Sequence, residues 1–172
     1  EGTFREYVRE TVASLASHGW DRVVVVNGHG GNVAPLREVC GRITRHDDAY
    51  AVPFTWFDAV DPGDVGVDPD AVSMGHGGPL ETALVRDIDP ALVREDRLDD
   101  AAAGAADGWG EWQSGTNLAY DSAEFSENGV VGDPRDGDEG LGERLREAAT
   151  AELTALVERV ATRETARPDR RA

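Results

Sequence analysis

Residues 3–17 carry a helical pattern of apolar positions. These positions are four, four and three residues apart, and they are Phe4, Val8, Val12 and Leu15. Because this spacing puts them on one stripe, we predict an amphipathic helix that ends at the pair His18–Gly19. The helix dipole favours His18 at such an end, so we interpret it as a helix residue and not as a ligand.

A run of valines at 23–26 predicts a strand from about Arg22 to Asn27. Consecutive β-branched residues suit a strand of a parallel sheet that helices bury on both faces. The strand stops at the turn 28–32, where we expect Gly28, Gly30 and Gly31 to take positive φ. We therefore expect His29 at the carboxyl end of the strand, where open α/β sheets bind ligands.

The following residues predict a helix and a second strand. We expect Asn32 to cap a helix that runs to about Arg45, and residues 49–54 to form a strand parallel to the first. The expected buried residues of this helix are Val33, Leu36, Val39, Cys40 and Ile43. Trp56 and Phe57 follow the second strand, and they either line a pocket at the His29 edge or pack in the core.

A second glycine–histidine turn occupies residues 75–78, after a stretch with loop composition at 58–75. It leads into a predicted helix at about 80–86 that has Pro79 near its start. With His76 in the loop and Glu81 in the first helical turn, both side chains can point to one side of the helix N-terminus.

The remaining chain gives weaker signals until its last helix. Residues 94–112 show no pattern from which an element can be predicted, while 117–125 suit a strand or extended segment. A turn at 126–129 follows. An apolar stripe predicts a helix at about 139–163, and we expect residues 164–172 to form a frayed tail.

Length and composition indicate one soluble domain. A chain of 172 residues can bury one core, so we expect a single domain over 1–172. Because the sequence shows neither an 18-residue apolar run nor a signal peptide, we expect a cytoplasmic protein without membrane contact. Cys40 is the only cysteine, which excludes an internal disulfide and a cysteine-cluster zinc site.

The chain is strongly acidic, with 34 acidic residues against 17 basic ones and a formal net charge of −17. Such a surface repels nucleic acid and anionic membranes, so we expect neither as a partner. All the basic residues are arginines. A lysine-free acidic composition resembles that of extreme halophiles, although a GC-rich genome also explains part of the lysine deficit.

The two histidine turns, with Glu81 nearby, indicate a hydrolytic metal site. Imidazole and carboxylate are usual ligands of zinc and similar ions, and hydrolytic sites leave a coordination position open for water. A phosphate site is a weaker alternative, because the lysine of a nucleotide P-loop is absent and the glycine spacing is not that of a dinucleotide-binding motif. The serine nucleophile elbow of another class of hydrolases is also absent. In a third interpretation the glycines only make turns and both histidines only satisfy local hydrogen bonds.

At these residues the sequence resembles the creatininase family, also called creatinine amidohydrolases. The similar stretches are VVVVNGHGGN at 23–32, GHGGPLETA at 75–83 and SENGVVGDP at 126–134, together with the helix before the first motif. The resemblance implies a three-layer α/β/α fold with a mostly parallel sheet. It also implies two divalent metals (Zn, Mn or Fe), hydrolysis of a carbon–nitrogen bond in a small cyclic or non-peptide amide, and a homo-oligomer, often a hexamer.

The resemblance also implies roles for individual residues. His29 corresponds to a metal ligand, Glu81 to an acidic residue at the metals, and His76 to the histidine that transfers a proton. Metal-activated hydroxide would then attack the amide carbonyl while His76 protonates the leaving nitrogen. The substrate-side loops would comprise Asn27, Gly28, Gly30, Gly31, Asn32, Gly77 and Gly78.

Two departures from the family pattern shape these expectations. Creatininases proper carry a glutamate where this chain has Gly31, so the turn is more similar to the GHGGN branch. That branch includes archaeal formamidopyrimidine-ribotide deformylases and peptidases that mature the mycofactocin precursor.

The second departure concerns the family's N-terminal segment, whose Glu-x-His pair and aspartate ligate metal and have no counterpart before Glu1. We therefore expect the chain to be the C-terminal two-thirds of a creatininase-like domain. Its function is then that of a metal-dependent amidohydrolase, or of a non-catalytic module that keeps the fold.

Overall fold

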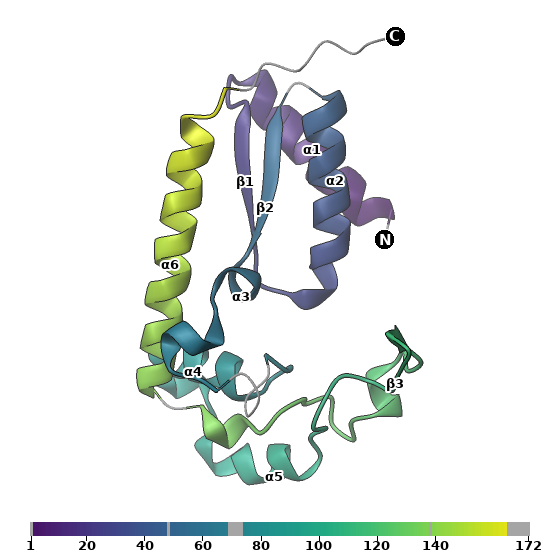
Figure 1. Cartoon of the computed structure of the whole chain (residues 1–172), viewed down its shortest axis with the longest axis vertical. Coiled ribbons are helices and arrows are strands. Elements are labelled where there is room, and N and C mark those ends of the chain that lie inside the picture. Colours follow the sequence, from purple (N-terminus) through teal and green to yellow (C-terminus); the bar gives the residue numbers. More distant parts are fainter. Residues whose placement is uncertain (1, 48, 69–73, 138, 165–172) are drawn as a thin grey trace. The chain divides into compact units, whose positions relative to one another are not determined.

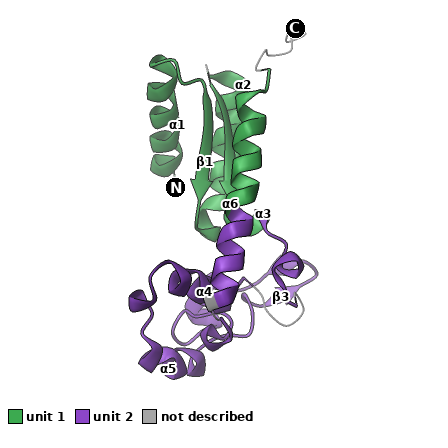
Figure 2. Ribbon diagram, turned by 90° about the vertical axis from the view of Figure 1, so that its left-hand side faces the viewer, with its two compact units in different colours: residues 1–59, 150–172 green, residues 60–149 purple. Residues whose placement is uncertain are grey.

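The computed structural model describes residues 2–47, 49–68, 74–137 and 139–164. The chain forms two compact units, one of residues 1–59 with 150–172 and the other of residues 60–149 (Figure 2). A single domain over 1–172 therefore stays a prediction. Residues 69–73 of the predicted loop and 165–172 of the predicted tail lie outside the described residues.

Helices and strands alternate in the first half of the chain, and short helices and turns dominate the second (Figure 1). In chain order they are α1 (Gly2–Ser17), β1 (Arg22–Asn27), α2 (Val33–His46), β2 (Tyr50–Thr55), α3 (Trp56–Ala59), α4 (Pro79–Ile88), α5 (Leu98–Ala103), β3 (Trp112–Gln113), β4 (Thr116–Asn117) and α6 (Glu139–Ala161).

The first unit is built on a parallel pair of strands. β1 and β2 run side by side in register from the pair Arg22 and Tyr50 to the pair Asn27 and Thr55. Helices α1 and α2 pack on one face of this pair, and they enclose a core of Val12, Leu36, Val39, Cys40, Ile43, Ala49 and Ala51. The part of α6 that belongs to this unit runs along the other side of the strands (Figure 1). This order of layers confirms the predicted α/β/α arrangement with a parallel sheet.

The valine run is less buried than predicted. Residues 23–25 are only half-buried, and Val26 keeps 60% of its surface exposed. Val23 and Val25 pack against the core of α1 and α2, whereas the alternation of side chains puts Val26 on the other face of the strand pair; within the described residues only β2 pairs with β1. The prediction of a strand buried on both faces was therefore wrong, although the strand itself is confirmed.

In the second unit, loops and short helices pack around α4. Ala83 of α4 and Val131 of a neighbouring loop are fully buried. Gly137 and Gly142 lie against the α4 backbone, where a Cβ atom would collide with the carbonyl oxygens of Pro79 and Ala83. The segment 94–112, from which no element was predicted, contains α5 and the start of the β3–β4 hairpin.

The last helix matches its predicted range closely and crosses from one unit to the other. Leu141, Leu145 and Val160 of its apolar stripe are buried. Among the described residues, no helix combines the length and the apolar character that a bilayer crossing requires.

Cys40 gives a pH-dependent test of the first unit's core. Burial raises the pKa of its thiol from 9.0 to about 11, since the core disfavours the thiolate. The folded state therefore keeps the proton in a pH range where the unfolded chain loses it. The stability contributed by the neutral thiol is complete below pH 9, and it is lost as the pH rises toward 11.

We predict that wild type loses on the order of 1–3 kcal/mol more free energy of unfolding than Cys40→Ala between pH 8.5 and 11, at 1.36 kcal/mol per pKa unit. Urea titrations at several pH values measure this difference, and tyrosine ionisation cancels because both proteins share it. Parallel pH profiles for the two proteins would contradict a thiol buried in this core.

Candidate functional site

The side chain of Asn27 positions the first histidine turn. Asn27 ends β1 and is 3% exposed. Its Nδ2 donates to the His29 carbonyl at 2.9 Å and to Thr55 Oγ1 at 3.1 Å, while its Oδ1 accepts from the His29 amide at 3.2 Å. One buried amide thus holds the backbone of His29 on both sides and ties it to the end of β2.

Two predictions for this turn were wrong. Gly28, Gly30 and Gly31 do not take positive φ, because residues 30–32 form a 3₁₀ turn that runs directly into α2. Asn32 has φ −92° and ψ −11°, and its side chain makes no capping hydrogen bond. Since the 3₁₀ turn continues the chain in right-handed helical geometry, Asn32 does not adopt the extended backbone of a typical capping residue.

Gly31 provides space for the imidazole of His29. A Cβ atom at residue 31 would lie only 2.9 Å from His29 Nε2, so the exposed imidazole folds back over the glycine. Phe57 borders the same turn, since its ring lies 4.0 Å from the position of a Cβ at Gly30. Trp56 packs edge-on against Phe57 with the ring centroids 5.6 Å apart. This places Phe57 beside the His29 turn.

The second histidine turn is fixed by backbone contacts in the other unit. His76 and Val131 form an antiparallel bridge in which each amide donates to the other's carbonyl, at 3.0 and 2.9 Å. A Cβ atom at Gly75 would collide with the Val131 carbonyl oxygen, and one at Gly78 would lie 2.5 Å from it. Gly75 also has φ +61°, a conformation that favours glycine. These glycines are needed because the Val131 peptide passes directly over the turn.

Glu81 lies beside His76, as the sequence predicted. It occupies the third position of α4, and its Oε2 accepts the Gly77 amide at 2.5 Å. The same oxygen lies 4.0 Å from His76 Nδ1, and the two side chains are 31% and 53% exposed. This distance between Glu81 Oε2 and His76 Nδ1 is longer than a hydrogen bond.

The third motif, at residues 126–134, builds the segment that holds His76. Ser126 Oγ donates to the Val130 carbonyl at 2.9 Å and accepts the Gly129 amide at the same distance. Asn128 Oδ1 accepts the Val130 amide at 3.0 Å. Beyond Val131, hydrogen bonds from Arg135 keep the pKa of Asp133 below its ordinary value. The motif thus fixes the conformation of the segment whose Val131 peptide is hydrogen-bonded to His76.

Sequence reasoning missed one residue of this site. The Trp109 ring lies 6.1 Å from the His76 ring, and it also packs edge-on against Phe125 at 6.0 Å. Trp109 remains 47% exposed. The available signal was an aromatic residue between two glycines, 108 and 110, in an acidic stretch that carries no periodic pattern.

The described residues alone do not complete a metal site. His29 and Glu81 have the right donor chemistry, but no three His, Cys, Asp or Glu side chains are grouped to hold an ion within the described part of the chain. His29 belongs to the first unit, whereas His76 and Glu81 belong to the second.

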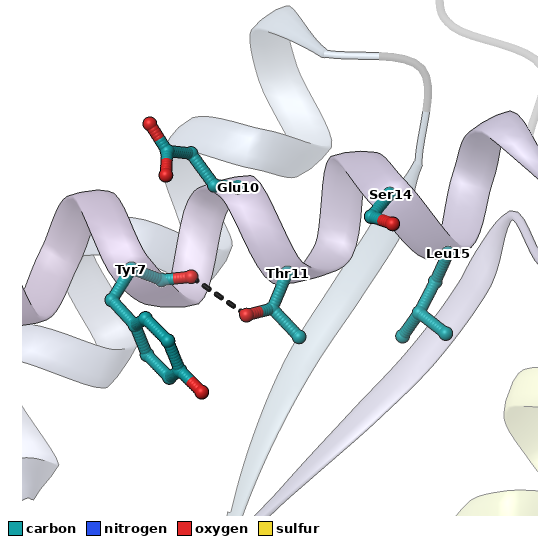
Figure 3. A pocket seen from close by; sticks show the side chains of 5 residues that line it. All are labelled: Tyr7, Glu10, Thr11, Ser14 and Leu15. Atoms are coloured by element: carbon teal, nitrogen blue, oxygen red, sulfur yellow. Dashed lines mark hydrogen bonds between the residues drawn. The ribbon is translucent and has the colours of Figure 1, made fainter.

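A shallow hollow lies elsewhere, on the outer side of α1 (Figure 3). The residues that line it all come from this helix, and they are Tyr7, Glu10, Thr11, Ser14 and Leu15. It shares no residue with the predicted site.

The family assignment follows from comparison with known proteins. The model of the creatininase family, described as creatinine amidohydrolase, matches residues 1–157. The chain belongs to the creatininase family. No protein of curated function matches the sequence.

Solved creatininases share the fold. A manganese creatininase is 24% identical with a TM-score of 0.69, and a mutant creatininase of a Zn-Zn type is 23% identical with a TM-score of 0.67; each alignment covers 92% of this chain. A mutant creatininase complexed with creatine is 22% identical, with a TM-score of 0.71 and 91% of this chain covered. In all three cases this chain spans 64% of the length of the solved protein.

The hydrogen bonds of the first turn predict how much stability is lost when Asn27 is replaced. Asn27→Ala removes three hydrogen bonds of a buried amide, so we expect a loss of about 1–3 kcal/mol in the free energy of unfolding. Asn32→Ala is the matched control, and it should stay within about 0.5 kcal/mol of wild type because it removes no capping bond. Urea denaturation measures both values. Equal losses for the two variants would show that Asn27 does not hold the turn.

The close contact in the second turn predicts how much stability is lost when Gly75 is replaced. Gly75→Ala brings a Cβ against the Val131 carbonyl, and we expect it to cost more than about 2 kcal/mol. Gly77→Ala is the control, because it has a similar φ of +57° against +61° but meets only a side-chain methyl at 3.9 Å. Thermal melts of both variants separate the collision from the strain of positive φ. A Gly77→Ala melting temperature at or below that of Gly75→Ala would refute the collision.

Proposed function

We propose that the protein is a metal-dependent amidohydrolase that cleaves a carbon–nitrogen bond in a small non-peptide amide, either cyclic or N-formylated. The observation that carries this proposal is the His76–Glu81 pair, built into one of the three motifs of a chain that belongs to the creatininase family. The creatininases with manganese, with zinc and with creatine support the metal and the amide class.

His76 is proposed as the proton donor to the leaving nitrogen. Its side chain is half exposed and therefore accessible to a substrate. Its backbone is held by the two hydrogen bonds with Val131, which fix the Cα atom from which the imidazole extends.

Glu81 and His29 are proposed as metal ligands. When bound, a divalent metal supplies an activated water and stabilises negative charge on the carbonyl oxygen. Glu81 Oε2 is already engaged by the Gly77 amide, which orients the carboxylate at the start of α4. Since the described residues group no three donors, a complete site requires additional ligands.

A non-catalytic role is the second candidate. The observation that favours it is the same lack of three grouped donors within the described part of the chain. In that case the chain would keep the creatininase fold as a structural or interaction module. Homo-oligomerisation, a cytoplasmic location, a halophilic source and a peptide substrate also stay predictions.

Turnover measurements with the purified protein separate the two candidates. The protein is supplied in turn with Mn²⁺ and Zn²⁺ and is tested for hydrolysis of creatinine, for formate release from a formylaminopyrimidine ribotide, and for cleavage of a short peptide. We expect turnover of one of the first two substrates, and we expect chelation to abolish it.

His76→Ala tests the proton step in the same assays. We expect kcat to fall by about 100-fold or more, the typical contribution of a general acid. His18→Ala is the control and should keep full activity, because His18 is an exposed residue just after α1. An unchanged kcat in His76→Ala would refute the assigned role, and no turnover with either metal would favour the non-catalytic module.

A further inference from the structure

We infer that Trp109 is a specificity-determining residue, and that a flat, conjugated amide substrate stacks on its indole beside His76. The inference rests on the proposed function, and it narrows the substrate class to amides that carry a flat conjugated ring. The contacts that support it all lie in the unit of residues 60–149.

Trp109 offers an accessible aromatic surface next to the proposed proton donor. The centroids of the Trp109 and His76 rings are 6.1 Å apart, and the ring planes are inclined by 53°, so the rings are neighbours without being stacked. Trp109 keeps 47% of its surface exposed, and the His76 side chain keeps 53%. A ligand that contacts the indole therefore lies within reach of the imidazole.

The backbone of Trp109 is held by the hairpin that follows it. Trp112 Nε1 donates to the Trp109 carbonyl at 2.5 Å. Asn117 Oδ1 accepts the Glu111 amide at 3.1 Å. Gly110 has φ +66°, and a Cβ atom there would collide with the Asn117 side chain. The hairpin thus closes tightly behind Trp109 and fixes the direction in which the indole extends.

The indole is also supported from the side by Phe125. The two rings pack edge-on, with their centroids 6.0 Å apart. Phe125 directly follows the 3₁₀ turn Ser122–Glu124, which Asp121 and Glu124 close with a reciprocal capping box. An aromatic surface that is held in place before binding loses little conformational entropy when a ligand binds.

A flat conjugated amide is the ligand that suits this surface. The face of an indole binds flat conjugated groups by offset stacking, with the atoms of the two planes about 3.5–4.0 Å apart. Because the Trp109 and His76 centroids are only 6.1 Å apart, a heterocycle stacked on the indole brings its amide nitrogen beside the imidazole. A saturated or strongly branched amide cannot lie flat on the indole, so Trp109 favours the conjugated ring.

Steady-state kinetics of Trp109 variants test the inference in metal-loaded protein. The substrate is whichever of creatinine and a formylaminopyrimidine ribotide the wild type turns over, since both carry a flat ring. We expect Trp109→Ala to raise KM about tenfold or more, the usual effect of losing a stacked heterocycle, and to leave kcat within about threefold.

Two further variants separate stacking from apolar contact. Trp109→Leu should raise KM as Trp109→Ala does, because it keeps apolar bulk without an aromatic face, whereas Trp109→Phe should stay within about threefold of wild type. Tyr120→Ala is the control and should keep the wild-type KM, since Tyr120 is an aromatic residue of the same unit that is 94% exposed.

A binding measurement provides a readout besides activity. The same compound is titrated into the metal-loaded His76→Ala variant, in which the proposed function expects slow turnover, and the tryptophan indole resonances are followed by NMR. The Trp109 resonance is assigned by its loss in Trp109→Phe. We expect it to shift with the ring compound and to stay in place with a short peptide.

The outcomes distinguish the inference from the proposed function. An unchanged KM in Trp109→Ala, a wild-type KM in Trp109→Leu, a loss that falls on kcat alone, or an unmoved Trp109 resonance overturns the inference and leaves the proposed function standing. No turnover by wild type with either metal overturns the proposed function, and the inference with it.

Discussion

The second turn depends on the close passage of one peptide, Val131, over its backbone. The two hydrogen bonds between His76 and Val131 bring the chains so close that no side chain fits at Gly75 or Gly78. Val131 is completely buried, so neither bond competes with water. The position of His76, and through it the pairing with Glu81 and the contact with Trp109, follows from this peptide.

The two glycine–histidine turns look alike in sequence but are built differently. A side chain, that of Asn27, organises the first, and its glycine at 31 serves to make room for the His29 imidazole. The backbone organises the second, where glycine is needed for close approach and for positive φ. Similar motifs therefore tolerate different substitutions, because one turn is sensitive at a buried amide and the other at a peptide contact.

The sequence predicted most of the regular structure, since the helices α1, α2 and α6 have clear apolar stripes and the valine run identifies β1. It did not predict the exposure of Val26, because burial of a strand depends on which strands and helices cover it. The predictions of positive φ at Gly31 and of capping by Asn32 were wrong for a local reason. A 3₁₀ turn at residues 30–32 takes the place of the tight turn that the sequence predicted. Trp109 was missed because its neighbour His76 is distant in sequence, and only the Val131 segment brings the two together.

Two independent observations support the proposed metal-dependent hydrolysis, and they are membership of the creatininase family and the geometry of the second unit. The family leads us to expect a metal and an amide substrate, and the second unit places His76 beside Glu81, the two residues for which we propose the roles of proton donor and metal ligand. Anomalous diffraction at the zinc edge, from crystals of the protein grown with zinc, tests the proposed metal ligands most directly. We predict that His29, through a ring nitrogen, and Glu81, through a carboxylate oxygen, each contact a zinc ion. A structure in which neither residue contacts zinc would contradict the assignment of a metal-dependent hydrolase.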